Sequence, residues 1–241
     1  MTTDYSETPT GEFEVESSID SVGFDYLIRL RAMFTQLERR PDIEVLNSEI
    51  YEPVPDVVVE LAETGSGQKV PPQILSLYKL FDGFDLEWRY LGEGGGHGKV
   101  ELHGLATVFG TWTNTIWGNV EGTDREKVDF SWQLRGVDSA WSQKDGHRTV
   151  FHVADCLPDF SLYLYDPSNP ICRLRGNLGA YLERLLETGG LRDWPLLWSD
   201  VDFDENQGLR DRATSAWRTL RRVFPAVDMT PYTWPDGEGA R

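Results

Sequence analysis

The segment at residues 71–90 constrains the fold of this chain more than any other part of the sequence. Two prolines open it, and apolar residues at helical spacing follow them, which predicts a helix that begins at the prolines. Asp82 and Gly83 predict the end of this helix, because glycine readily adopts the left-handed conformation that follows many helix ends. Residues 84–90 then alternate between apolar and charged side chains, as in a strand with one buried face. A helix, a glycine and a half-buried strand are therefore predicted in succession.

The same periodicities predict the other elements. A glycine-rich loop at residues 91–98 joins the first strand to a second and predicts a hairpin. The helix that begins at Leu178 has Asn177 as its N-cap and Gly189 at its end. A proline start favours a helix at residues 55–63, although its three β-branched valines oppose this interpretation. Further helices are predicted at 24–40 and 209–223, and further strands at 99–103, 128–134, 149–154 and 160–166, the last two as an antiparallel pair.

The composition predicts one folded α+β domain with terminal additions. The chain has 241 residues, of which 39% are apolar and 12% aromatic, and this is enough to form a substantial core. We expect residues 1–20 to be an acidic, flexible arm and residues 21–190 to be the α+β domain. Residues 191–225 are predicted to be a helical extension packed on that domain, and residues 226–241 a flexible tail.

The charge excludes several classes of ligand. The formal net charge is -17, and a negative field of this size repels nucleic acid and anionic lipid headgroups. The two cysteines, Cys156 and Cys172, are too few for a disulfide framework, so we expect reduced thiols. Residues 1–20 contain six acidic residues, no basic residue and no apolar run, so we expect neither a signal peptide nor a membrane anchor. These features predict a cytoplasmic protein.

Residues 72–83, which read Pro-Gln-Ile-Leu-Ser-Leu-Tyr-Lys-Leu-Phe-Asp-Gly before an aromatic strand, resemble the SUKH superfamily of bacterial immunity proteins and fungal Smi/Knr cell-wall regulators. Asp82 stands where the family usually has asparagine. The resemblance covers the first helix and residues 71–189, including two strands that end at Asp166 and the leucine-rich helix after them. It implies a SUKH-like α+β domain, with a twisted mixed or antiparallel sheet flanked by helices, that binds and neutralises a toxin. The family supplies no active site that could be transferred to this chain.

The sequence segments that resemble phosphate-binding, metal-binding or calcium-binding motifs lack residues that these motifs require. The glycine-rich loop has Glu93 where a phosphate-binding loop needs glycine, and no serine or threonine follows Lys99. The four histidines form no metal-binding pattern. Asp200, Asp202 and Asp204 resemble the start of a calcium loop, but the glycine and glutamate that such a loop needs are absent. We therefore expect no cofactor, no metal and no enzymatic activity, and a hydrolase with dispersed catalytic residues remains an alternative that needs a pocket.

The acidic residues around the predicted helix and strand are the candidate partner-binding site. Asp82, Asp85, Glu87 and Glu93 would form an acidic edge that attracts a basic protein, although each one alone is better explained as an ordinary outward residue. The leading hypothesis is an immunity protein whose partner is a toxin encoded nearby, such as a nuclease. A regulatory or scaffold SUKH-like binding protein is the alternative.

Overall fold

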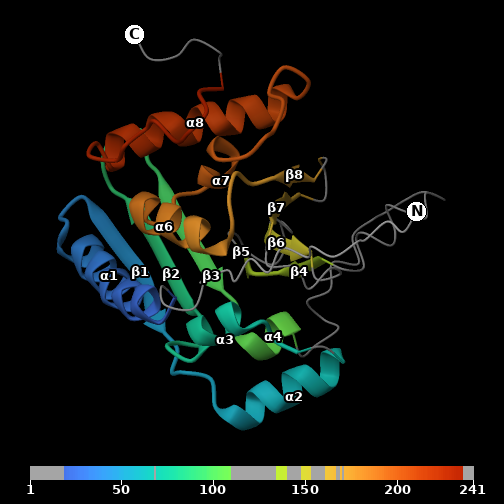
Figure 1. Cartoon of the computed structure of the whole chain (residues 1–241). Coiled ribbons are helices and arrows are strands. Elements are labelled where there is room, and N and C mark those ends of the chain that lie inside the picture. Colours follow the sequence, from blue (N-terminus) through green and yellow to red (C-terminus); the bar gives the residue numbers. More distant parts are fainter. Residues whose placement is uncertain are drawn as a thin grey trace, which may run out of the picture.

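The computed structural model describes residues 19–67, 69–109, 134–139, 148–152, 161–166, 169 and 171–235, and for residues 19–24, 66, 73 and 152 it describes the backbone alone. The helices are α1 (Ile19–Arg39), α2 (Asp56–Ser66), α3 (Pro72–Tyr78), α4 (Leu105–Phe109), α6 (Leu178–Thr188), α7 (Trp194–Leu197) and α8 (Gln207–Val223). The strands are β1 (Ile43–Ile50), β2 (Phe84–Tyr90), β3 (His97–Leu102), β4 (Leu134–Gly136), β5 (Asp138–Ser139), β6 (Arg148–His152), β7 (Leu162–Tyr165) and β8 (Cys172–Arg173). The fold is α+β, as predicted (Figure 1).

The described strands form two sheets where the sequence predicted one. Sheet A has the order β1-β2-β3-β5 and sheet B the order β4-β6-β7-β8, and all the described neighbouring pairs are antiparallel. Only Val137 separates β4 from β5, so the chain passes from sheet B to sheet A at this residue. The predicted antiparallel pairing of the strands at 149–154 and 160–166 is confirmed by β6 and β7.

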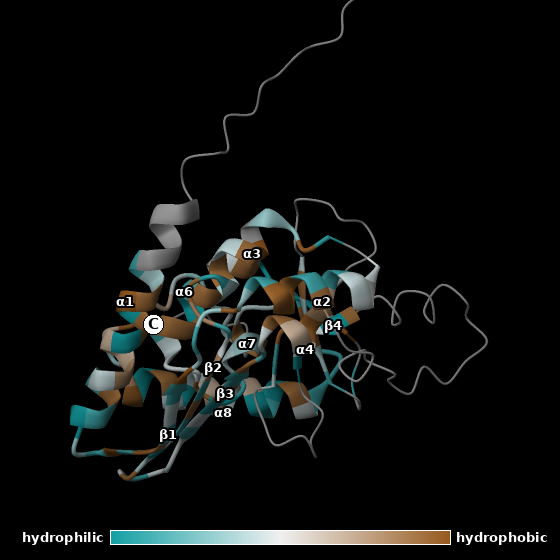
Figure 2. Ribbon diagram, turned by 90° about the horizontal axis from the view of Figure 1, so that it is seen from below, coloured by the Kyte–Doolittle hydropathy of each residue, from teal (hydrophilic) through white to brown (hydrophobic). Residues whose placement is uncertain are grey.

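One face of sheet A packs against helices, and no described helix covers the opposite face, which we call the helix-free face. In Figures 1 and 2, α1 and α6 lie together along one side of β1, β2 and β3. The side chains on that side of β2 are Phe84, Leu86 and Trp88, and all of them are fully buried. The ring of Phe34 in α1 meets Phe84 edge-on, with 5.8 Å between the ring centroids. Because side chains alternate along a strand, the charged residues of β2 lie on the opposite face.

The predicted succession of helix, glycine and strand is present, but the helix ends earlier than expected. Helix α3 ends at Tyr78 with Lys79 as its C-cap, so Gly83 lies several residues past the helix end. Gly83 instead begins the entry into β2 with a φ of 98°. A Cβ atom there would lie 2.2 Å from the carbonyl oxygen of Leu102, so the glycine allows β2 and β3 to approach each other closely.

The C-terminal part of the described chain belongs to the same core as the rest. Helix α6 has Asn177 as its N-cap, whose side chain accepts a hydrogen bond from the Ala180 N–H, and Gly189 in the left-handed conformation as its C-cap, as predicted. Residues 226–235 are packed, where the sequence predicted a flexible tail. Tyr232 is buried, and the Trp234 ring packs edge-on against Trp217 of α8. The Trp234 ring buries apolar surface on α8, and the Tyr232 hydroxyl donates a hydrogen bond to Glu187 of α6.

Other differences concern short elements. Strand β1 and the short helices α4 and α7 were not predicted, since their apolar residues do not form a clear period. The helix at residues 55–63 exists as α2, with Pro55 as its N-cap. Residues 110–133 and 140–147 lie outside the described residues, and of the strand expected at 128–134 only its last residue is described.

Candidate functional site

Three carboxylates lie side by side on the helix-free face of sheet A. The register of β1 with β2 places Glu49 opposite Asp85, and the register of β2 with β3 places Asp85 opposite Glu101. We call these three residues the carboxylate row. Like charges directly opposite each other on neighbouring strands destabilise a sheet. A row of this kind therefore requires compensation from its surroundings or from a binding partner.

The described surroundings compensate the row with neutral donors. The Tyr51 hydroxyl donates a hydrogen bond of 2.6 Å to Asp85, and the Ser139 hydroxyl donates one of 2.9 Å to Glu101. One oxygen of Asp85 is buried and has no hydrogen-bond partner among the described residues. Within the part of the chain that the structure describes, no lysine or arginine forms an ion pair with any residue of the row. Among the described residues, the carboxylates of the row are thus not paired with a lysine or an arginine.

Tyr51 and His103, two titratable neighbours of the row, do not neutralise its negative charge. Burial and the adjacent Asp85 carboxylate raise the pKa of the Tyr51 phenol, so this residue remains a neutral donor at pH 7. Burial lowers the pKa of His103 below its ordinary value, and the nearby Arg148 lowers it further, against the opposing effect of Glu101. His103 Nδ1 lies 3.6 Å from a Glu101 oxygen, but a neutral imidazole supplies no positive charge there.

Next to the row, the same face carries charges that are already paired. Glu87 accepts a hydrogen bond of 2.6 Å from Lys99 on β3, and Glu44 forms an ion pair with Arg89 across β1 and β2. Among the described residues of this face, the carboxylates without a lysine or arginine partner are therefore those of the row.

An exposed apolar side chain lies on β1, three residues before Glu49. The register of β1 shifts between Val45 and Asn47, so that Leu46 is the extra residue of a β-bulge. Its side chain is 53% exposed. Bulges commonly redirect a side chain away from the regular sheet pattern. Leu46 thus adds an apolar contact point to a strand that otherwise offers polar side chains to solvent.

The four residues predicted from the sequence lie at separate places. Asp85 and Glu87 share the helix-free face of β2, whereas Glu93 is exposed in the loop at the far end of the hairpin. Asp82 accepts a hydrogen bond of 2.7 Å from the Leu105 N–H at the start of α4. Burial raises the pKa of the Asp82 carboxyl, although this hydrogen bond opposes the shift. These contacts give Asp82 a structural role, and the predicted partner-binding role of the four residues stays a prediction.

Sequence reasoning missed two members of the row. Glu101 lies at an outward position of the predicted strand at 99–103, so the alternation along that strand could have indicated it. Glu49 lies on β1, which was not predicted, and its position opposite Asp85 depends on the bulge at Leu46. Only the strand pairing brings the three carboxylates together.

The described side chains of the row offer negative charge and hydrogen-bond acceptors. Among the described residues, no group of three or more His, Cys, Asp or Glu side chains could hold a metal ion. In the calcium-like segment, Asp202 accepts a hydrogen bond from the Asp204 N–H. Ser139 donates its hydroxyl proton to Glu101 instead of to a histidine. Burial raises the pKa of the Cys172 thiol to about 11, so this thiol is protonated at pH 7. Cys156 lies outside the described residues.

Comparison with known proteins adds no assignment. The chain matches no protein-family model and no curated protein. The resemblance to the SUKH superfamily therefore stays a prediction that rests on residues 72–83 and on the order of the later elements. None of the helices in the described part of the chain is both long enough and apolar enough to cross a membrane.

Proposed function

We propose that this chain is a non-catalytic protein-binding module, and that its partner presents basic side chains to the carboxylate row. The observation that carries the proposal is the alignment of Glu49, Asp85 and Glu101 on three neighbouring strands, with neutral donors and no described lysine or arginine partner. Such a row is unfavourable in the free protein and becomes favourable when a cation from a partner lies over it. Binding energy is thus available at this face.

The most specific form of the proposal is an immunity protein that neutralises a toxin, such as a nuclease encoded nearby. A nuclease holds nucleic acid with lysine and arginine side chains, so its active surface is complementary to an acidic row. The formal net charge of -17 would accelerate the encounter of two such proteins. Leu46 would supply an apolar contact beside the charged centre. The resemblance to the SUKH superfamily and a cytoplasmic location are both consistent with this proposal.

The test compares two variants that lose the same number of charges. In the first, Glu49→Gln, Asp85→Asn and Glu101→Gln remove the row but retain oxygen acceptors for Tyr51 and Ser139. In the second, Glu60→Gln, Asp200→Asn and Glu205→Gln remove three exposed carboxylates from α2 and from the turn before α8. Each is co-expressed with the toxin candidates from the adjacent reading frames, and growth and affinity are measured.

We expect the control variant to protect cells as the unmodified protein does, and the row variant to lose about tenfold or more in affinity and to fail to protect. The association rate of the unmodified protein should fall between low and high salt, because screening weakens the attraction of exposed charges. Full protection by the row variant would refute the role of the row. Row-dependent binding of a partner whose activity survives would instead favour the regulatory or scaffold alternative.

A further inference from the structure

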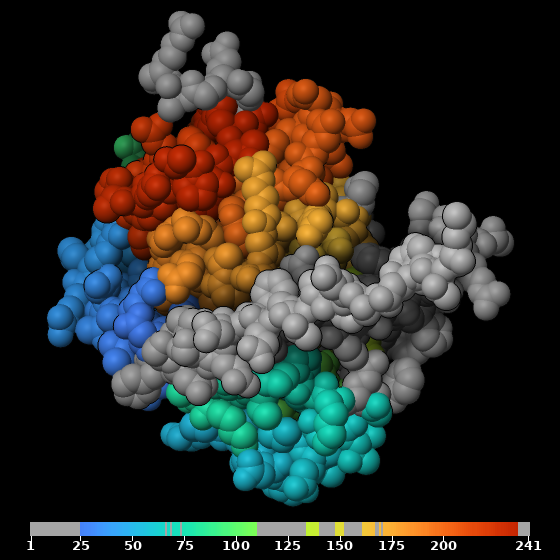
Figure 3. Space-filling model, viewed as in Figure 1, coloured from blue at the N-terminus to red at the C-terminus, as the bar shows by residue number. Residues whose placement is uncertain are grey.

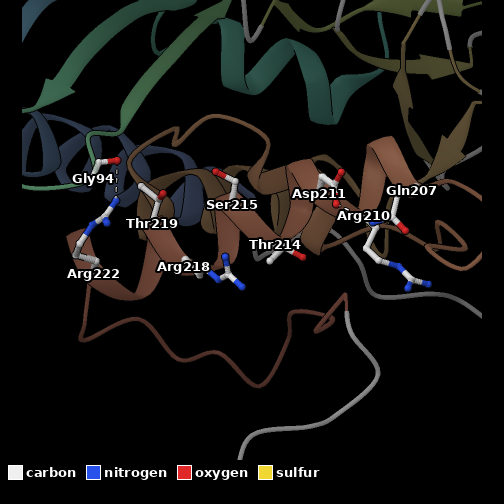
Figure 4. Close-up of a pocket in the computed structure, with 9 residues that line it drawn as sticks. All are labelled: Gly94, Gln207, Arg210, Asp211, Thr214, Ser215, Arg218, Thr219 and Arg222. Carbon is white, nitrogen blue, oxygen red and sulfur yellow. Dashed lines mark hydrogen bonds between the residues drawn. The ribbon is translucent and has the colours of Figure 1, made fainter.

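A second charged surface, of opposite sign, lies along α8. Arg210, Thr214, Arg218 and Arg222 follow one another at intervals of four residues, and we call them the basic row. Residues spaced by four lie on the same face of a helix, and this row spans about 18 Å at 1.5 Å per residue. Figure 4 shows Arg210, Thr214 and Arg218 along one side of α8, with Arg222 reaching toward Gly94. The helix lies on the surface at one end of the molecule (Figure 3).

A groove with a volume of about 490 Å³ follows the basic row. Its lining consists of side chains of α8 together with Gly94 of the β2–β3 loop. Asp211, Ser215 and Thr219, again at intervals of four residues, form its second side, as Figure 4 shows. A neighbouring hollow of about 440 Å³ shares these three residues and Gly94. The groove is therefore continuous along the helix, with guanidinium groups on one side and mainly hydroxyl groups on the other.

Two of the three arginines of the basic row form hydrogen bonds or ion pairs with other described residues, and the third forms none. Arg210 donates a hydrogen bond of 3.1 Å to the Phe203 carbonyl and pairs with Asp204. Arg222 donates one of 2.7 Å to the Gly95 carbonyl. Arg218 is exposed, and it forms no hydrogen bond or ion pair within the described ranges.

The charge of the groove is positive on a strongly acidic protein. Its lining holds three guanidinium groups and one carboxylate, that of Asp211, and the net charge is +1 when Asp204, which pairs with Arg210, is included. The Asp211 carboxylate already accepts a hydrogen bond of 2.7 Å from the Gln207 amide. By contrast, Arg212 on the same helix forms buried ion pairs with Asp166 and Asp193, so it is committed to the fold. Arg218 forms no ion pair of this kind within the described residues, so stability of the fold does not explain its position.

We propose that this groove binds an extended acidic peptide segment of a partner protein. A planar guanidinium group can donate two parallel hydrogen bonds to a carboxylate. The hydroxyls of Thr214, Ser215 and Thr219 can form hydrogen bonds with a peptide backbone. A length of about 18 Å corresponds to about five or six residues of extended chain. A small anion would stay largely hydrated in a groove that is open to solvent, and salt would screen its attraction to the arginines. This favours a longer ligand that contacts several residues of the groove. The overall negative field opposes the long phosphate backbone of a nucleic acid more than a short peptide.

The proposal is tested with a fluorescein-labelled peptide that has glutamate at alternate positions, by fluorescence anisotropy on the full chain. Arg218→Gln is the main variant, because Arg218 holds no described contact and its loss leaves the fold intact. Arg210→Gln with Arg218→Gln is the second variant. The control is Arg31→Gln with Arg39→Gln, which removes two exposed arginines from α1.

We expect the double variant on α8 to weaken peptide binding by about tenfold or more and Arg218→Gln by a smaller factor, while the control stays within about twofold. A peptide with glutamine in place of glutamate should not bind. Equal binding by the α8 variants and the unmodified protein would overturn the proposal. Inorganic pyrophosphate that binds in an Arg218-dependent way, while the glutamate peptide does not, would also overturn it and indicate a phosphate site. None of these outcomes depends on the carboxylate row.

Discussion

The phenol of Tyr181 on α6 donates a hydrogen bond to the carboxylate of Asp138 on β5, and both residues are buried. The Thr149 N–H on β6 donates a further bond of 2.8 Å to Asp138, and the Thr149 hydroxyl donates one of 3.2 Å to the Tyr181 oxygen. Asp138 follows the residue at which the chain passes between the two sheets. This network therefore connects sheet A, sheet B and α6 at one point.

The network predicts a dependence of stability on pH. Burial raises the pKa of Asp138 from 3.8 to about 6, despite the opposing hydrogen bonds from Tyr181 and Thr149. The native state therefore holds a proton that the unfolded state loses above pH 3.8, and this group stabilises the fold at low pH. Its contribution should be lost as the pH rises from about 4 to about 6, by about 3 kcal/mol in total.

Urea denaturation across pH 4–7 checks this prediction by comparing the unmodified protein with Asp138→Asn. Asparagine can accept the Thr149 N–H bond and donate to the Tyr181 oxygen, so the variant should fold without the titration. The difference in unfolding free energy between the two proteins should change by about 3 kcal/mol across this range. A difference that is constant with pH would show that Asp138 does not titrate there.

The second prediction concerns Arg212, which joins α8 to two buried carboxylates. It lies 2.7 Å from Asp166 and 2.6 Å from Asp193. Arg212→Ala would remove the cation that joins the two carboxylates, while Arg192 would still lie 3.5 Å from Asp193, so we expect a loss of about 2 kcal/mol in unfolding free energy. Arg218→Ala, on an exposed position of the same helix, should cost less than about 0.5 kcal/mol. Thermal and urea unfolding of both variants give the comparison, and similar losses would contradict this account.

The third prediction follows from the repulsion within the carboxylate row. Glu49→Lys places a cation opposite Asp85, so the free protein should gain about 0.5 kcal/mol of stability at low salt. The gain should shrink in 1 M salt, because screening weakens the interaction between exposed charges. Urea unfolding at two salt concentrations measures it, with Glu49→Gln as a neutral comparison. A loss of stability in Glu49→Lys would mean that the row is not strained in the free protein.

The fourth prediction concerns Gly83 at the entry to β2. Gly83→Ala should cost about 3 kcal/mol, because its φ of 98° is unfavourable for alanine and the new Cβ atom would meet the Leu102 carbonyl. Gly95 also has a positive φ, of 58°, but a Cβ atom there has no atom within 4 Å. Gly95→Ala should therefore cost only about 1 kcal/mol. Equal effects on the thermal midpoint would show that the contact with Leu102 is unimportant.

Much of the fold could be predicted, because several elements carry their own local signals. The helix from Leu178 has an N-cap at Asn177 and a left-handed glycine at its end, and the structure shows both. The alternation along residues 84–90 predicted the buried face of β2 correctly. The end of α3 was predicted too late, since the signal at Gly83 belongs to the approach of two strands and not to a helix end.

Less of the candidate site could be predicted, because its residues become neighbours only through strand pairing. Asp85 and Glu87 were named from their alternation, but Glu49 and Glu101 were not. The position of Glu49 depends on the bulge at Leu46, which shifts the register of β1 by one residue. No local pattern reveals which strands pair or in which register.

The sequence by itself determined the elements whose signals are local, such as the helices with caps and the strands with regular alternation, because these depend on neighbouring residues. Tertiary structure alone decided that Glu49, Asp85 and Glu101 form a row and that Asp138 meets Tyr181. These contacts join residues far apart in the chain. Strand pairing and its register set the row, and the position of α6 against β5 sets the contact of Asp138 with Tyr181, and short-range patterns encode neither.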